Sequence, residues 1–151
     1  MISIHRALAE DAAALSQIAF AAKAHWGYPE RWLEIWKPQL TFSSEYFEQN
    51  ESWMAEEDGV PMGFYTLQDK AGNAWIENLW VSPEFIGRGI GKQLFLYAAE
   101  LSRQRDYKTL QLEADPNAVG FYKKMGMVQT RERHSEVESQ PRILPVMEMN
   151  L

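Results

Sequence analysis

The segment that decides the fold is Val81-Ser82-Pro83-Glu84-Phe85-Ile86-Gly87-Arg88-Gly89-Ile90-Gly91-Lys92. An apolar run ends at its Ser-Pro step, three glycines follow at alternate positions, and an amphipathic helix begins almost at once. Glycines in such a turn let the backbone approach a ligand closely, and the helix N-terminus adds roughly half a positive charge. The segment therefore predicts a loop that holds a diphosphate through backbone N–H groups.

The residues around this loop predict a βαβ unit. Residues 74–81 alternate as a strand does, residues 90–103 carry an apolar stripe at helical spacing, and residues 108–113 form the next strand. One face of the first strand is expected to carry Trp75, Glu77, Leu79 and Val81. Connections this short make the two strands parallel neighbours with a right-handed crossover.

The rest of the chain predicts further strands and helices around this unit. An Asp-Gly pair at 58–59 between two apolar runs predicts a hairpin. The expected strands are residues 2–6, 52–57, 60–68, 74–81, 108–113, 127–137 and 143–149, and the expected helices begin near Glu10, Pro29, Ser43, Ile90 and Asp115. We therefore expect a single α/β domain over residues 1–151, a mixed and mostly antiparallel sheet of about seven strands, in which strands 4 and 5 are parallel, flanked by four to five helices.

Two commoner phosphate loops do not fit the positions of the glycines. A P-loop requires G-x-x-x-x-G-K-[ST], but its first glycine falls on Ile86, and Gln93 replaces the hydroxyl residue after Lys92. The dinucleotide fingerprint G-x-G-x-x-G places its third glycine on Lys92, and it belongs on a first strand rather than a fourth. Neither class of nucleotide loop is therefore expected here.

The loop resembles the acetyl-CoA loop of the GNAT superfamily of N-acetyltransferases, written [QR]-x-x-G-x-[GA]. Ile86-Gly87-Arg88-Gly89-Ile90-Gly91 follows the pattern except at Ile86, which replaces a polar or basic residue. Residues 79–84 resemble the end of the family's fourth strand, and residues 117–127 resemble its second motif, N-x-x-[AG]-x-x-[FY]-Y-x-x-x-G-[FM], slightly compressed. With the order of the elements, the resemblance covers essentially all 151 residues. It implies the GNAT fold and an enzyme that uses acetyl-CoA as co-substrate.

The resemblance assigns the cofactor contacts to three segments. The backbone of Leu79, Trp80 and Val81 is expected to pair with the pantetheine arm as an added strand does. The residues expected to hold the pyrophosphate are Ile86, Gly87, Arg88, Gly89, Ile90, Gly91 and Lys92, with charge added by Arg88 and Lys92. Asn117 is expected to form a hydrogen bond with the arm. Its alternative role is helix capping, but Asp115 is already placed as the N-cap, which favours the role in binding.

The resemblance also implies the catalytic residues. Tyr122 matches the tyrosine that protonates the departing thiolate, and a phenol with a pKa of about 10 suits a thiol with a pKa of about 8.5. Glu77 matches a strand-four glutamate that removes the proton of the incoming amine; its alternative role is a pair with a neighbouring cation. His5, His25 and His134 are alternative bases. The chain has no cysteine for an acyl-enzyme, so direct transfer within a ternary complex is expected.

The acceptor is expected to be a primary amine of a small molecule or peptide. His25, Trp26 and Tyr28 lie in a connection between two helices and are expected to line its pocket; core packing is their alternative role. A net charge of −6 suits a cationic amine and argues against a nucleic-acid partner, because phosphate backbones need clustered Lys and Arg. No metal is expected. The resemblance to the superfamily suggests a homodimer, and the sequence itself does not determine the oligomeric state.

Composition limits the remaining classes. Hydrophobic content of 46% and charged content of 24% are those of an ordinary globular protein. No stretch approaches the roughly 20 apolar residues that cross a bilayer, so we expect a cytoplasmic protein without a membrane partner. Two other hypotheses are a non-catalytic acyl-CoA-binding sensor or regulatory module, and a structural interaction domain without cofactor, which leaves the glycine loop unexplained.

Overall fold

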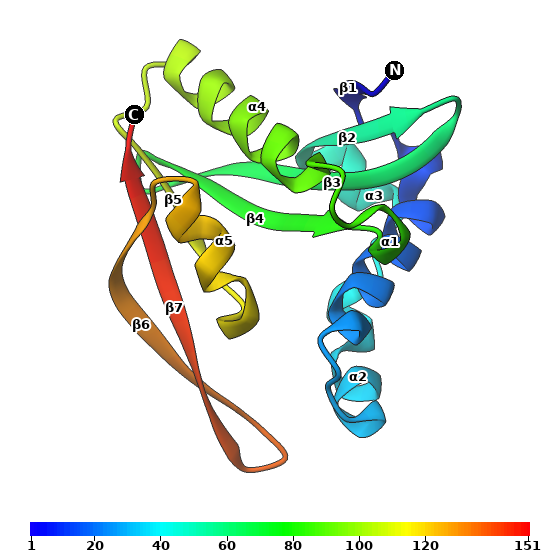
Figure 1. Cartoon of the computed structure of the whole chain (residues 1–151), viewed down its shortest axis with the longest axis vertical. Helices are drawn as coiled ribbons and strands as arrows, with labels where there is room; N and C mark the ends of the chain where they lie inside the picture. Colours follow the sequence, from blue (N-terminus) through cyan, green and yellow to red (C-terminus); the bar gives the residue numbers. More distant parts are fainter.

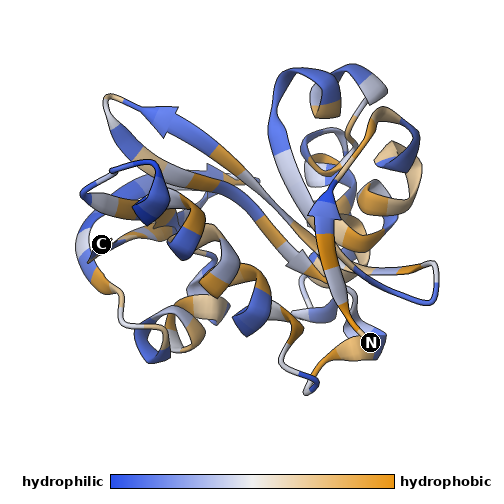
Figure 2. Ribbon diagram, turned by 90° about the horizontal axis from the view of Figure 1, so that it is seen from above, coloured by the Kyte–Doolittle hydropathy of each residue, from blue (hydrophilic) through white to orange (hydrophobic).

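The computed structural model describes all residues from 1 to 151 as a seven-stranded sheet with helices on both faces (Figure 1, Figure 2). The strand order is β1-β2-β3-β4-β5-β7-β6, and only β4 and β5 are parallel. The strands are β1 (Ser3–Arg6), β2 (Glu51–Glu57), β3 (Val60–Lys70), β4 (Asn73–Val81), β5 (Thr109–Glu113), β6 (Val128–Val137) and β7 (Gln140–Asn150). The expected mixed sheet with one parallel pair is confirmed.

Five α-helices and four short 3-10 turns cover the sheet. The helices are α1 (Ala12–His25), α2 (Glu30–Trp36), α3 (Ser44–Gln49), α4 (Ile90–Gln104) and α5 (Val119–Lys124). The 3-10 turns are η1 (Ala9–Asp11), η2 (Lys37–Leu40), η3 (Pro83–Phe85) and η4 (Pro116–Ala118). None of the helices combines the length and the apolar character needed to cross a bilayer.

Two apolar cores lie on opposite faces of the sheet. Tyr65 of β3 packs in the core under α4 and α5, together with Leu94 of α4. The next residue towards the N-terminus, Phe64, packs in the other core with Leu15 of α1 and Phe47 of α3. Successive strand residues point to opposite faces, so one strand supplies both cores. Each face therefore has its own layer of helices.

Tight turns join the antiparallel neighbours. The pairs Asp58-Gly59, Ala71-Gly72 and Glu138-Ser139 each have positive φ at both residues, as two-residue hairpin loops require. The predicted hairpin at 58–59 is confirmed. β7 begins at Gln140, three residues before the expected start of the last strand, because the Glu138-Ser139 turn is this short.

β4 has one more residue than β3 in the paired region, and the alternation of apolar and polar residues in the sequence does not predict it. Thr66 of β3 pairs with Asn78, and Leu67 pairs with Ile76, so Glu77 between them has no partner. Such a β-bulge places two residues of one strand opposite one position of its neighbour and reverses the alternation beyond it.

The bulge changes the face of the sheet that Glu77 occupies. Ile76, Leu79 and Val81 all pack on the core under α4. The Glu77 carboxylate instead accepts a hydrogen bond at 2.8 Å from the indole N–H of Trp75, on the opposite face. The expectation that Glu77 shares a face with Leu79 and Val81 is therefore wrong, because pairing with β3 determines its direction.

β4 and β5 stay together over only three residue pairs, from Ala74–Leu110 to Ile76–Leu112. Beyond these pairs β4 continues beside β3, whereas β5 continues beside β7. The two strands diverge, and a wedge opens in the sheet (Figure 1). Residues 77–81 of β4 face this wedge without a strand partner on that side.

A half-buried group of polar side chains joins the two sides of the wedge. Asp115, which follows β5, accepts hydrogen bonds from Lys23 Nζ of α1 at 2.7 Å and from Tyr28 Oη at 2.9 Å. Arg142 of β7 donates to Tyr28 Oη at 3.0 Å. Both cations also lie 4.5 to 5.3 Å from the ring centroids of Tyr28 and Trp36. We call Lys23, Tyr28, Asp115 and Arg142 the bridge.

The bridge sets the ionisation of Asp115. Burial alone would raise the pKa of this carboxyl, but Lys23, the Asn117 N–H and Tyr28 outweigh burial and hold the pKa below its ordinary value. A carboxyl with a lowered folded pKa stabilises the fold at pH values above its unfolded pKa of about 3.9. This contribution is lost as the pH falls through the lower folded pKa.

We expect the free energy of unfolding to decrease as the pH falls below about 4, and to decrease less steeply in the variant Asp115→Asn, which has no carboxyl to protonate there. Urea denaturation at a series of acidic pH values measures both slopes. The matched control is Asp58→Asn in an exposed hairpin turn, which is expected to keep the wild-type slope. Equal slopes for Asp115→Asn and the wild type would contradict the role of the bridge.

Candidate active site

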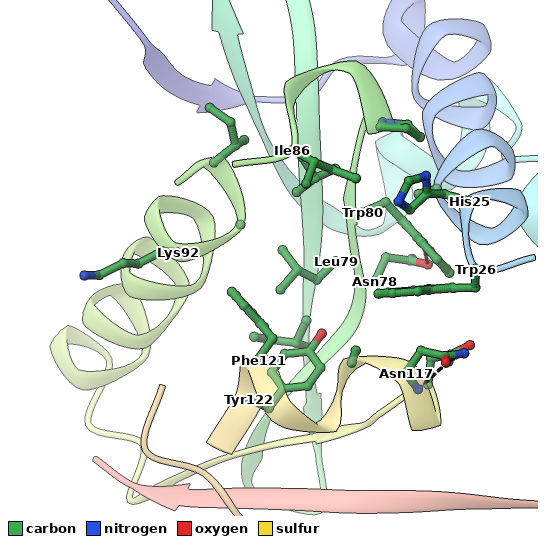
Figure 3. A pocket seen from close by; sticks show the side chains of 18 of the residues that line it. His25, Trp26, Asn78, Leu79, Trp80, Ile86, Lys92, Asn117, Phe121 and Tyr122 are labelled. Carbon is green, nitrogen blue, oxygen red and sulfur yellow. Dashed lines mark hydrogen bonds between the residues drawn. The ribbon is translucent and has the colours of Figure 1, made fainter. Parts of the chain in front are cut away.

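A cavity of about 460 Å³ occupies the wedge between β4 and β5 (Figure 3). Its walls come from the end of α1, from β4, from the glycine loop, from the end of β5 and from the η4–α5 segment. The predicted site residues that line it are His25, Trp26, Glu77, Leu79, Trp80, Val81, Ile86, Gly87, Gly89, Ile90, Gly91, Lys92, Asn117 and Tyr122. Arg88 and Tyr28 do not line it.

The glycine loop presents unpaired N–H groups at the start of α4. Gly87 and Gly89 have φ values of 88° and 76°, a region that side chains rarely adopt. The N–H groups of Ile86 and Arg88 bond within the loop, to carbonyl oxygens three residues earlier at 3.2 and 3.3 Å. The N–H groups of Gly87 and of residues 89–92 have no acceptor in the protein. Such a cluster at a helix N-terminus can hold a phosphate group.

Neither cation of the loop points into the cavity. Arg88 donates to Glu57 at 3.1 Å, and its guanidinium lies 5.8 Å from the centroid of the Phe85 ring. Lys92 lines the cavity, but its side chain extends away from the centre (Figure 3). The groups that the loop offers to an anion are therefore its N–H groups, and the added charge of Arg88 and Lys92 stays a prediction.

β4 offers a free edge beside the loop. Residues 79–81 pair with residues 63–65 of β3 on one side, and β5 has already diverged on the other. Backbone N–H and C=O groups on such an edge need partners from water or a ligand. An extended, amide-containing ligand can pair with this edge as an added strand does.

Tyr122 places a phenol in the cavity wall. Its side chain is 8% exposed, and its ring lies 6.2 Å from Phe95 and 5.1 Å from Phe121, centroid to centroid. The hydroxyl has no hydrogen-bond partner in the protein and points towards the middle of the cavity (Figure 3). Burial, and to a smaller extent Asp115, raises the pKa of Tyr122 above its ordinary value. The phenol therefore keeps its proton at neutral pH and can donate it.

Glu113 is a second carboxylate in the cavity, and it is absent from the site residues predicted from the sequence. Ile76 pairs with Leu112 at the last residue pair of β4 and β5, so Glu77 and Glu113 follow at the same level of the two strands. Both glutamates line the cavity. The expected parallel pairing is the signal that could have found Glu113, because aligned strand ends bring successive side chains together.

Both glutamates also line a polar groove of about 780 Å³ on the other face of the sheet. Lys70 Nζ lies 3.0 Å from the Glu77 carboxylate, and Arg133 Nε lies 2.6 Å from that of Glu113. The Glu77 side chain is 40% exposed, so its ion pair with Lys70 is weak and exchangeable. The two carboxylates therefore stand where the cavity and the groove meet.

Of the three histidines, only His25 lies in the cavity. Its ring centroid is 6.1 Å from that of Trp26 (Figure 3). His5 on β1 lies 3.2 Å from Glu56, and His134 on β6 lies 3.1 Å from Glu132, both outside the cavity. No group of three or more His, Asp or Glu side chains is placed to hold a metal ion.

Asn117 lies at the start of the η4–α5 segment and lines the cavity. Asp115 accepts a hydrogen bond from its backbone N–H at 2.9 Å, so the predicted capping by Asp115 is confirmed. Tyr28 lies behind Asn117 in the bridge, with its Oη 3.0 Å from Asn117 Nδ2. Tyr28 is expected from the sequence to line the acceptor pocket, but it does not line the cavity and instead contacts Asn117, which does.

The residues present fit the pantetheine and pyrophosphate groups of acetyl-CoA. The unpaired N–H groups of residues 89–92 suit the pyrophosphate, and the free edge of residues 79–81 suits the amides of the arm. The Tyr122 hydroxyl opens on the same space and supplies a proton donor. The cavity can therefore bind an extended, diphosphate-bearing thioester beside a proton donor.

Comparison with known proteins gives the same assignment. The sequence matches the Acetyltransferase (GNAT) family over residues 13–127. It is 33% identical over 107 residues to a peptidyl-lysine N-acetyltransferase of Salmonella typhimurium, a match that covers 70% of this chain and 68% of that protein. The first of the curated relatives are matched over half of their length or less, from 34% to 50%.

Solved structures share the fold over its whole length. The GCN5-related N-acetyltransferase of Rhodopseudomonas palustris superimposes with a TM-score of 0.84 at 26% identity, over 99% of this chain and 95% of that one. The PaiA N-acetyltransferase of Thermoplasma acidophilum, in complex with coenzyme A, gives a TM-score of 0.77 at 22% identity, over 100% and 99% of the two chains. The match to the family spans more than half of the sequence, and this chain belongs to the GNAT family of acetyltransferases.

Proposed function

We propose that this protein transfers an acetyl group from acetyl-CoA to a primary amine of a small molecule or peptide. The observation that carries the proposal is the cavity in the wedge, where an anion-binding loop, a free strand edge and an unpartnered phenol open on one space. Acetyl-CoA, when bound, supplies the thioester whose acetyl group is transferred. The coenzyme A held by the Thermoplasma protein supports this use of the fold.

The binding roles follow from the unpaired groups of the chain. The N–H groups of Gly87 and of residues 89–92 hold the pyrophosphate, and the edge of residues 79–81 pairs with the amides of the arm. Asn117 contributes a side-chain hydrogen bond to the arm. Ile86, which is 55% exposed, adds an apolar contact, and its own N–H is used within the loop.

Tyr122 is the proposed general acid. Its hydroxyl is free of protein partners, and its raised pKa keeps it protonated at neutral pH. The charge of a thiolate leaving group is poorly solvated in an apolar wall of Phe121 and Leu79. Donation of the phenol proton to the sulfur as the C–S bond breaks keeps that charge from building up, and the Tyr122 phenolate that forms then takes a proton from solvent.

Glu77 is the proposed general base, and Glu113 shares its surroundings. A free alkylammonium has a pKa near 10.4, so it must lose a proton before it attacks. An amine that approaches from the groove meets both carboxylates before it reaches the cavity. They attract the ammonium form, and one of them, directly or through water, accepts its proton.

His25 and Trp26 are the proposed acceptor contacts. Both lie at the end of α1 on the cavity wall, and the indole of Trp26 is 42% exposed (Figure 3). An exposed indole face beside carboxylates suits a cationic amine. The name of the Salmonella relative makes a peptidyl lysine one acceptor to test first. The cytoplasmic location and the homodimer stay predictions.

The proposal is tested by incubating the protein with acetyl-CoA and a panel of amines that includes lysine peptides, peptide N-termini and polyamines. We expect thiol release with at least one acceptor and a mass increase of one acetyl group on it. Heat-denatured protein and a reaction without acceptor are the two blanks. Tight binding of coenzyme A without turnover across the panel would instead favour the non-catalytic acyl-CoA sensor.

Replacement of Tyr122 by Phe removes the proton donor and keeps the ring packing. We expect kcat to fall by at least about tenfold, because general acids contribute factors of roughly 10² to 10⁴. The affinity for acetyl-CoA should stay within about twofold, because the ring that lines the wall is retained. Steady-state kinetics and calorimetry measure the two quantities, and an unchanged kcat would remove Tyr122 from the acid role.

Glu77→Gln keeps the shape of the side chain and removes its basicity. We expect kcat/KM to fall by at least about tenfold near neutral pH. The matched control is Glu132→Gln, which lines the groove but not the cavity and should behave as the wild type. A loss confined to Glu113→Gln would transfer the role of base to Glu113.

A further inference from the structure

Asn117 has a fixed set of hydrogen-bond partners within the bridge. Its Nδ2 donates to Tyr28 Oη at 3.0 Å and to Asp115 Oδ1 at 3.0 Å. A side-chain amide has two N–H donors and one carbonyl acceptor. Both donors of Asn117 are therefore used inside the protein, and its carbonyl oxygen Oδ1 has no partner there.

The proton of Tyr28 determines the direction of these bonds. The bridge keeps Asp115 ionised, and a carboxylate only accepts, so the Tyr28 hydroxyl donates to it at 2.9 and 3.0 Å. Burial, followed by the charge of Asp115, raises the pKa of Tyr28 to about 12, so the hydroxyl keeps this proton. Its oxygen can then only accept from its remaining neighbours.

Those neighbours are both nitrogen donors. Arg142 Nη2 donates to Tyr28 Oη at 3.0 Å, and a guanidinium has no acceptor to offer in return. Asn117 Nδ2 is the second donor to the same oxygen. The Tyr28 hydroxyl thus donates to one carboxylate and accepts from two nitrogen donors. Its proton and both of its lone pairs are used.

The reversed amide of Asn117 is excluded by the same groups. A half-turn of the amide would bring its carbonyl oxygen against Asp115 Oδ1 and Tyr28 Oη, neither of which has a proton to give. Two hydrogen bonds would be replaced by two repulsive contacts next to a carboxylate. The bridge therefore allows one orientation of this side chain.

From this geometry we infer that Tyr28 is a positioning residue that acts through Asn117. It fixes the Asn117 amide so that the cavity receives a carbonyl oxygen rather than an NH2 group. The ligand group that Asn117 selects is an N–H donor, and the secondary amides of a pantetheine arm are of this class. The inference deepens the proposed function and rests on it for the identity of the ligand.

Tyr28 can be tested without disturbing the cavity wall, which it does not line. Its ring packs edge-on against Trp36, with the centroids 4.9 Å apart, and a phenylalanine ring fits the same place. The variant Tyr28→Phe removes only the hydroxyl. One anchor of Asn117 Nδ2 is lost, and the amide is then free to rotate.

We expect Tyr28→Phe to weaken the binding of coenzyme A by about threefold to tenfold, as the loss of one oriented hydrogen bond does. Calorimetry measures this affinity. In ¹⁵N spectra of the protein without ligand, the NH2 protons of Asn117 should exchange with water faster than in the wild type. Tyr107→Phe is the matched control, because it loses a phenol–carboxylate hydrogen bond of 2.7 Å to Asp69 far from the cavity, and should bind as the wild type.

A double-variant cycle separates positioning from a general structural role. In the Asn117→Ala background, Tyr28→Phe is expected to change coenzyme A affinity by less than about twofold, because its effect passes through the missing amide. Equal weakening in both backgrounds, or unchanged exchange of the Asn117 NH2 protons in Tyr28→Phe, would overturn the inference. Tight coenzyme A binding without acetyl transfer would contradict the proposed function alone. If no variant binds coenzyme A, the exchange rates of Asn117 still decide the inference.

Discussion

The divergence of β4 and β5 after three residue pairs is the constraint on which the rest of the structure depends. Parallel strands joined by α4 pair side by side from Ala74 to Ile76, and the core under α4 holds them there. Beyond this point each strand follows a different neighbour, so one edge of β4 lacks a partner inside the sheet. Unpaired backbone groups need polar partners. The cavity, the free edge and the two glutamates at its mouth all result from this separation.

An open wedge in a sheet would weaken the contact between its two sides, and the bridge compensates for this. The Asp115 carboxylate forms an ion pair with Lys23 from one side of the wedge, and Arg142 Nη2 lies 3.7 Å from it on the other side. These three side chains are only 10 to 12% exposed. A buried charge is tolerated only when it is fully paired, so each member of the bridge depends on the others. The same carboxylate caps η4 and orients Asn117, so the group that holds the wedge together also shapes its wall.

The parts of the fold with local causes follow from the sequence. The glycine loop, the helix after it and the Asp58-Gly59 hairpin depend on neighbouring residues and are confirmed. The bulge at Glu77 depends on pairing with β3, and the contact between Tyr28 and Asp115 joins positions 87 residues apart. Strand alternation and spacing carry no information about such contacts. The sequence therefore identifies the cavity's backbone features better than the direction of its polar side chains.

Ile86 departs from the family pattern at a position whose own backbone N–H is not free to bind a ligand. A polar side chain at this position could add a donor for a phosphate, but the N–H of Ile86 already bonds to the carbonyl oxygen of Pro83 at 3.2 Å. The unpaired N–H groups belong to Gly87 and to residues 89–92. Arg88 is likewise occupied with Glu57. Oriented N–H dipoles and the start of α4 can attract an anion without a cluster of cations at this site.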